Sequence, residues 1–208
     1  MFGLDTILRF IAQFHDVVPL IKTAGYIGIA FIVFAESGLF FGFFLPGDSL
    51  LFTAGFLASQ DYLNIWVLCL ITFLAAVLGD SVGYAFGRSV GPRLFKREDS
   101  IIFHKKHLQT AEKFYERNGP KTIVIARFMP VVRTFAPIVA GIGKMRYRTF
   151  ISYNLVGGAV WGIGMPTIGY FLGSTIPDVD RYLLPIIILI VFLSIAPGII
   201  HLLRAYFK

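Results

Sequence analysis

The sequence has a single cysteine and few charged residues. Only 15% of its 208 residues are charged, whereas 56% are hydrophobic and the mean hydropathy is +0.74. This composition excludes a large soluble core, and apolar stretches of roughly 20 residues match a bilayer core of about 30 Å. Cys69 has no second cysteine with which to form an internal disulfide. The chain is therefore predicted to be an all-α polytopic membrane protein.

The first residues lack the two features that mark a secretory signal peptide. Residues 1–18 have neither a basic n-region nor a small-residue cleavage site, so we expect no cleaved leader. Apolar residues recur on one helical face of this stretch, opposite Asp5, Arg9 and Asp16. That pattern is typical of an amphipathic helix at the membrane surface, and we assign residues 1–27 to an interfacial region.

Positive charge is concentrated in one predicted loop, residues 88–121. This loop holds nine Lys or Arg residues against four acids. Short basic loops stay in the cytoplasm, where their charges face water and anionic headgroups, so we expect no nucleic-acid site. His104 and His107 have a spacing compatible with a metal pair, but no third ligand accompanies them. We therefore expect neither a metal nor a cofactor.

The apolar segment 122–143 has basic residues at both ends. Lys121 precedes it and Lys144 follows it, so both ends are predicted to lie in the cytoplasm. A segment that enters and leaves on one face must be a re-entrant hairpin, and Pro130 and Pro137 provide the break. Its unwound backbone must be covered by protein or line a polar cavity.

Further apolar segments complete the predicted topology. Spanning helices are predicted at residues 62–87, 149–173 and 182–203. The last of these follows an acidic outer turn within residues 176–208 and places the C-terminus in the cytoplasm. Residues 28–57 are interrupted at Pro46 and Gly47. They could form a second hairpin that enters from outside, and a spanning segment is the alternative.

Two short motifs recur at one offset along the chain. Thr53-Ala54-Gly55 corresponds to Val139-Ala140-Gly141, and the glycine-bounded residues 83–87 correspond to residues 169–173, both 86 residues later (141 − 55). If each copy holds one hairpin and one spanning helix, it crosses the membrane once, and the second copy is inverted. The sequence thus predicts an inverted repeat, an architecture of transporters with broken helices. Chance matches between glycine-rich apolar segments are the alternative.

Charged residues interrupt both hairpin segments: Glu36 and Asp48 in the first, Arg127 and Arg133 in the second. A charge in a transmembrane helix costs about 2.5–3.5 kcal/mol, so it persists only near a partner, a water-filled cavity or an ionic substrate. Glu36 has no capping role and should be neutral unless an arginine lies near it. Asp48 follows a Pro-Gly pair, so it would either cap the next half-helix or bind an ion or proton there.

Arg127 and Arg133 each require an anionic partner, because a guanidinium does not lose its proton at reasonable cost. One interpretation is that the two arginines simply neutralise Glu36 and Asp48. The interpretation preferred here is that the arginines bind a lipid phosphate through forked donors. The two acids would then alternate between ion pairing and protonation, which makes them the proton-coupling residues.

Other residues are predicted to support these four. Asp80 is interpreted as an interior partner of Arg88 or Arg93, with a catalytic acid as the alternative. Thr134, three residues before Pro137, is expected to cap the second half-helix at the repeat position of Asp48. Residues expected only to pack helices closely are Gly157, Gly158, Trp161, Gly162 and Gly164.

These motifs together resemble one protein family. They comprise Glu36, Phe-Leu-Pro-Gly-Asp-Ser at residues 44–49, Gly-Asp-Ser-Val-Gly-Tyr at 79–84 and Arg-Phe-Met-Pro-Val-Val-Arg-Thr-Phe-Ala-Pro at 127–137. In this order and spacing, over about residues 28–175, they resemble the DedA family, also called SNARE-associated or VTT-domain membrane proteins. The resemblance implies translocation of lipid carriers, notably undecaprenyl phosphate, across the bacterial inner membrane, driven by the proton-motive force. It places the essential acids at Glu36 and Asp48 and the essential arginines at Arg127 and Arg133.

The sequence and the resemblance therefore predict a lipid transporter rather than an enzyme. Its partners would be a polyprenyl phosphate or phospholipid, protons and the surrounding membrane lipids, and both a monomer and a homo-oligomer are compatible with the chain. A proton-coupled exporter of cations or drugs would use the same acids but gives the arginines no task. An intramembrane lipid phosphatase is the enzyme alternative, but the four histidines, at 15, 104, 107 and 201, lie away from the buried charges.

Overall fold

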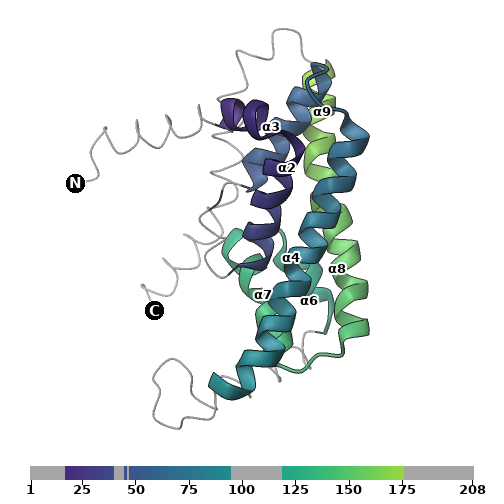
Figure 1. Ribbon diagram of the computed structural model, residues 1–208. Coiled ribbons are helices and arrows are strands. Elements are labelled where there is room, and N and C mark those ends of the chain that lie inside the picture. Colours follow the sequence, from purple (N-terminus) through teal and green to yellow (C-terminus); the bar gives the residue numbers. More distant parts are fainter. Residues whose placement is uncertain (1–16, 40–44, 46, 95–118, 176–208) are drawn as a thin grey trace, which may run out of the picture.

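The computed structural model describes residues 17–39, 45, 47–94 and 119–175 (Figure 1). This part of the chain is helical and contains no strand, which confirms the all-α prediction for it. Its helices are α2 (Val17–Gly38), α3 (Gly47–Ser59), α4 (Ile65–Leu94), α6 (Lys121–Ala126), α7 (Pro130–Ile142), α8 (Tyr147–Gly162) and α9 (Gly164–Thr175).

Several predictions fall on other residues. The surface helix before Val17, the histidine pair at residues 104 and 107 and the spanning helix at 182–203 lie outside the described residues. The predicted interfacial region, residues 1–27, overlaps the first part of α2, and this helix continues past residue 27. Gly25 kinks this helix, with φ 55° and ψ −152°, a backbone conformation that glycine adopts without steric cost.

Two helical segments are long and apolar enough to cross a bilayer. They are Ile65–Val90 in α4 and Tyr147–Thr175, which joins α8 to α9. They correspond to the spans predicted at residues 62–87 and 149–173. Figure 1 shows α4 running the length of the described part, with α8 and α9 end to end beside it.

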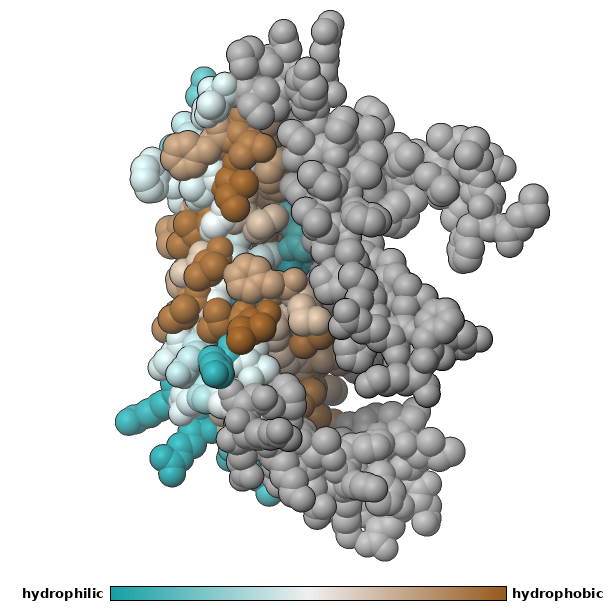
Figure 2. Space-filling view, turned by 180° about the vertical axis from the view of Figure 1, so that it is seen from behind, coloured by the Kyte–Doolittle hydropathy of each residue, from teal (hydrophilic) through white to brown (hydrophobic). Residues whose placement is uncertain are grey.

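The outward faces of these long helices are apolar. On α4 they carry Trp66, 81% exposed, and then Leu70, Leu74 and Leu78 at helical spacing. Seen from behind in Figure 2, the described face is largely hydrophobic, with hydrophilic residues gathered toward its lower end. An exposed apolar surface of this extent suits contact with lipid chains rather than water.

A polar bond from α4 supports the junction between α8 and α9. Pro166 has no backbone N–H, so the carbonyl of Gly162 lacks the usual helical donor. The hydroxyl of Thr72 donates to that carbonyl at 2.6 Å. Cys69 lies next to the same junction, with its sulfur 3.9 Å from the carbonyl of Ile163. The two long helical segments are therefore tied together where the second one is interrupted.

The segment predicted as the second hairpin contains two short helices, α6 and α7. The chain turns at residues 127–129, and α7 begins at Pro130, where proline's fixed φ and missing N–H are tolerated. Pro137 lies inside α7 rather than at a break. Thr134 also lies inside α7, so the prediction that it caps this helix is wrong: the helix begins four residues earlier.

Two short helices pack against segments from the other half of the chain: α3 against α9, and α7 against α4. Within each half, α2 lies against α4 and α6 against α8. Glycines permit these approaches: a Cβ at Gly87 would overlap the backbone of Ile138, and a Cβ at Gly169 would overlap the backbone of Phe52. Small residues that let backbones approach are common between membrane helices. This packing brings the ends of α2, α3, α6 and α7 together in the interior.

Candidate functional site

Arg133 bridges two acids that come from different helices. Glu36 lies in the last turn of α2 and Asp48 in the first turn of α3, while Arg133 lies in the first turn of α7. One terminal nitrogen of Arg133, Nη2, donates to Glu36 Oε1, and the other, Nη1, donates to Asp48 Oδ1 at 2.6 Å. The exposed fractions of the side chains are 1% for Glu36, 5% for Arg133 and 17% for Asp48. We call these three residues the bridging triad.

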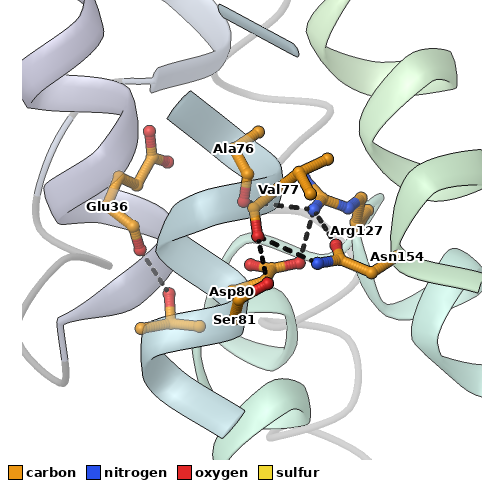
Figure 3. Close-up of polar contacts among 8 residues, drawn as sticks. Glu36, Ala76, Val77, Asp80, Ser81, Arg127 and Asn154 are labelled. Atoms are coloured by element: carbon orange, nitrogen blue, oxygen red, sulfur yellow. Dashed lines mark hydrogen bonds and ion pairs between the residues drawn. The ribbon is translucent and has the colours of Figure 1, made fainter. Parts of the chain in front are cut away.

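Arg127 takes part in a second buried cluster. Its Nη2 pairs with the carboxylate of Asp80 and donates to Asn154 Oδ1 at 2.6 Å. Asn154 in turn donates through Nδ2 to the carbonyl of Val77 at 3.0 Å. Figure 3 shows Arg127 and Asn154 converging on α4 at Asp80, with the carboxylate of Glu36 directed away from them. We call Asp80, Arg127 and Asn154 the anchored cluster.

Trp161 on α8 lies against both groups of charges. Its Nε1 donates to Asp48 Oδ1 at 2.7 Å, and the Arg133 Cζ atom lies 4.6 Å from the centre of its ring. Arg127 Cζ lies 6.0 Å from the same ring. An aromatic face attracts a cation at these distances, more strongly where water is excluded. Trp161 was expected only to pack helices, and that interpretation missed its contacts with the site.

Two glycines make room for the charged side chains. Gly47 lies directly against the Glu36 carboxylate, so that any side chain at this position would overlap it. A Cβ at Gly157 would lie 2.9 Å from Arg127 Cδ and 3.0 Å from Nε, closer than ordinary packing allows. Gly47 of the Pro-Gly pair and Gly157 of the Gly-Gly pair therefore leave the space that the Glu36 and Arg127 side chains occupy.

The structure thus separates the two arginines that the sequence grouped together. Arg133 contacts both predicted acids, whereas the ion pair of Arg127 is with Asp80. Asp80 pairs with Arg127 rather than with Arg88, which is exposed, while the side chain of Arg93 lies outside the described part of the structure. Helical spacing suggested the arginines that follow Asp80 on the same segment. The partner that contacts Asp80, Arg127, comes instead from a distant segment of the chain.

Asn154 is a site residue that the sequence analysis missed. It is fully buried, and its amide joins Arg127 to the backbone of α4. The available signal was an amide side chain in the middle of an otherwise apolar spanning segment, where a polar group needs a specific partner. As for metals, no group of three or more His, Cys, Asp or Glu residues that could hold one occurs within the ranges that the structure describes.

Comparison with known proteins identifies the family. The VTT domain matches residues 45–171. Protein DedA of Escherichia coli K12 is 43% identical over 205 residues, 98% of this chain and 93% of that protein. An uncharacterized membrane protein of Mycobacterium tuberculosis H37Rv is 46% identical, over 86% of this chain and 79% of its own. No solved structure matches the chain.

A further similar protein is the inner membrane protein YqjA of Escherichia coli K12, 31% identical over 79% of each chain. The match to DedA spans nearly the whole chain and so includes the interrupted helices, both long apolar segments and the five charged residues of the site, whereas the VTT-domain match begins after Glu36. Together with the two candidate spans, they agree with the membrane assignment made from composition. The chain therefore belongs to the DedA family of membrane proteins, which carry the VTT domain.

Proposed function

We propose that this protein is a transporter that moves a phosphate-bearing lipid, undecaprenyl phosphate or a related phospholipid, across the bacterial inner membrane, coupled to the proton-motive force. The observation that carries this proposal is the bridging triad. A buried arginine holds two carboxylates from separate helices with its two terminal nitrogens. Those nitrogens are the forked donors that recognise phosphate in other proteins.

The proposed cycle follows from competition for Arg133. A phosphate would compete with Glu36 and Asp48 for the N–H groups of these two nitrogens. Protonation makes release favourable, because a neutral carboxyl attracts the guanidinium much less than a carboxylate does. Protons entering on one side of the membrane would therefore free Arg133 for the headgroup, and proton departure on the other side would expel it.

The arrangement of helices suits such a cycle. We infer that α2 with α3, and α6 with α7, form two re-entrant hairpins related by an inverted repeat, as the sequence predicted. The packing supports this, because each half of the chain contributes a short helix to the other: α3 packs on α9, and α7 packs on α4. Transporters with inverted repeats bind substrate near the midplane, between broken helices. The N-terminus of α3 would supply a partial positive charge to the site.

The test is lipid flipping in proteoliposomes with and without an imposed pH gradient. We expect flux of a fluorescent polyprenyl phosphate that rises with the gradient and is lost in the Glu36→Gln variant. Two control measurements address other classes of function: inorganic phosphate release would indicate a lipid phosphatase, and efflux of cationic drugs without lipid flux would indicate an exporter. Flux that does not change with the pH gradient, for every lipid tested, would contradict the proposal.

A further inference from the structure

The carboxylate of Glu36 lies against the N-terminus of α3. A Cβ on Gly47, the first residue of that helix, would overlap the carboxylate. Through Oε1 the same carboxylate accepts a hydrogen bond from Nη2 of Arg133. A helix N-terminus presents backbone N–H groups and a partial positive charge, and it binds anions for this reason. Glu36 therefore occupies a place suited to an anion, in contact with both a helix N-terminus and a guanidinium.

The carboxylate leaves part of the bonding capacity of this place unused. Glu36 and Arg133 are 1% and 5% exposed, and neither Oε2 of the first nor Nε of the second has a hydrogen-bond partner among the described residues. Buried polar atoms normally have partners, because an unmade hydrogen bond costs free energy. A phosphate monoester has three terminal oxygens where a carboxylate has two, so it offers Arg133 an additional acceptor. The unpartnered donor therefore favours a phosphate over the carboxylate in this place.

The second acid of the bridging triad is held more firmly than Glu36. Oδ1 of Asp48 accepts hydrogen bonds from Arg133 at 2.6 Å and from Trp161 at 2.7 Å. Asp48 also lies in the first turn of α3, where the dipole of its own helix favours a negative charge. Glu36 lies in the last turn of α2, where the dipole opposes one, and among the described residues its carboxylate accepts a hydrogen bond only from Arg133. Glu36 is therefore the acid that an incoming anion displaces more easily.

We propose that the Glu36 carboxylate is a tethered substitute for a phosphate group, which takes its place on Gly47 and Arg133 while Asp48 keeps its bonds. This inference rests on the proposed function and makes it more specific, because it names the acid that leaves and the helix end that receives the phosphate. The glycine is required in both states, since a residue without a Cβ lets an anion approach the backbone closely. The same chemistry recognises a lipid headgroup and free phosphate, so both are used as probes.

Two charge-matched variants of the purified protein test whether Glu36 occupies the phosphate site. Glu36→Gln and Glu36→Ala both remove the negative charge, but only alanine also vacates the place at Gly47. Titration calorimetry with inorganic phosphate and with butyl phosphate should therefore give affinities at least about tenfold higher in Glu36→Ala than in Glu36→Gln, because a competing group is absent. The corresponding pair Asp48→Asn and Asp48→Ala should not show this gain. Glu36→Ser, whose short side chain also vacates the place, replaces Glu36→Ala if that variant does not fold.

The contribution of the α3 N-terminus is tested in the Glu36→Ala background. Adding Gly47→Ala returns a methyl group to the emptied place and should reverse the gain in phosphate affinity. Gly164→Ala is the matched control, because Gly164 is the first residue of α9 and a Cβ there would meet nothing within 4 Å. Neither glycine has a positive φ, so alanine can adopt the backbone at both positions. Phosphate affinity should be unchanged by the control substitution.

The proposal and the proposed function fail separately. Equal phosphate affinities in Glu36→Gln and Glu36→Ala, an equal gain in Asp48→Ala, or no effect of Gly47→Ala would overturn the phosphate site described here even if lipid flux were present. The predicted gain and its reversal without any lipid flux in the wild type would support the site and contradict transport. Binding of inorganic phosphate but not of butyl phosphate would overturn the assignment of the site to a lipid headgroup.

Discussion

Individual residues in this protein act through the partners that distant segments bring to them. Arg133 is suited to exchange one anionic partner for another, because its two terminal nitrogens bind two separate carboxylates. Arg127 is suited to a fixed position, because one of its nitrogens is surrounded by Asp80, Asn154 and a backbone carbonyl of α4. Sequence patterns identified Glu36, Asp48 and both arginines as buried charges, but only the tertiary contacts distinguish the roles of the two arginines.

Lysine substitutions should reveal this difference. Arg133→Lys keeps the charge but supplies a point donor that cannot grip two oxygens in a fork, so lipid flux should fall about tenfold or more. Arg127→Lys should mainly lower the stability of the fold, because the interaction with Asp80 and Asn154 is structural. The measurements are flux in proteoliposomes and thermal unfolding for each variant. Equal loss of flux in two equally stable variants would contradict the division of roles.

Trp161 offers a second prediction. Trp161→Phe keeps an aromatic ring beneath Arg133 but removes the N–H that donates to Asp48. A hydrogen bond to a charged group contributes about 1.5–3 kcal/mol, so the variant should be less stable than the wild type by an amount in that range. Thermal unfolding in detergent measures this. Equal stabilities of the variant and the wild type would show that this bond contributes nothing.

Among the elements, interrupted helices decide the architecture. The sequence located the interruptions near Pro46 and Pro130, because proline and glycine disfavour helix continuation. It placed the start of α7 too late, since Pro137 is tolerated inside that helix while Pro130 begins it. It also did not anticipate the junction at residue 163, where Pro166 removes a donor and a hydroxyl on α4 replaces it.

That replacement is testable in the Thr72→Val variant. The substitution preserves shape but leaves the Gly162 carbonyl without its donor. Side-chain hydrogen bonds between membrane helices average about 0.6 kcal/mol and reach about 1.7 kcal/mol, so unfolding in detergent should be easier by an amount in that range. Thr72→Ser retains the hydroxyl and should behave more like the wild type. Equal stabilities of the Val and Ser variants would show that the bond contributes nothing.

For the whole molecule, composition was sufficient to indicate a helical membrane protein, and the packing of α3 on α9 and α7 on α4 agrees with two exchanged halves. Membrane topology follows from a different physical rule, the retention of Lys and Arg in the cytoplasm. The contacts within the protein do not contain that information. Which side each charged end faces therefore stays a prediction of the sequence.

Cysteine labelling measures that topology. Lys121 and Lys144 flank α6 and α7, and both are exposed. Single cysteines at these two positions, in a Cys69→Ala background, should react with a membrane-impermeant thiol reagent only from the cytoplasmic side. Labelling of the two positions from opposite sides would mean that residues 122–143 cross the bilayer, which excludes the proposed hairpin and inverted repeat.

The central claim is that a phosphate headgroup and two acids compete for Arg133. Titration calorimetry in buffers with different ionisation enthalpies measures it directly, because it counts the protons exchanged when a short-chain lipid phosphate binds to the purified protein. We predict net proton uptake on binding, reduced in Glu36→Gln, and binding at least about tenfold weaker in Arg133→Lys. Binding without proton uptake in the wild type, or binding unaffected by the Arg133 substitution, would contradict the claim.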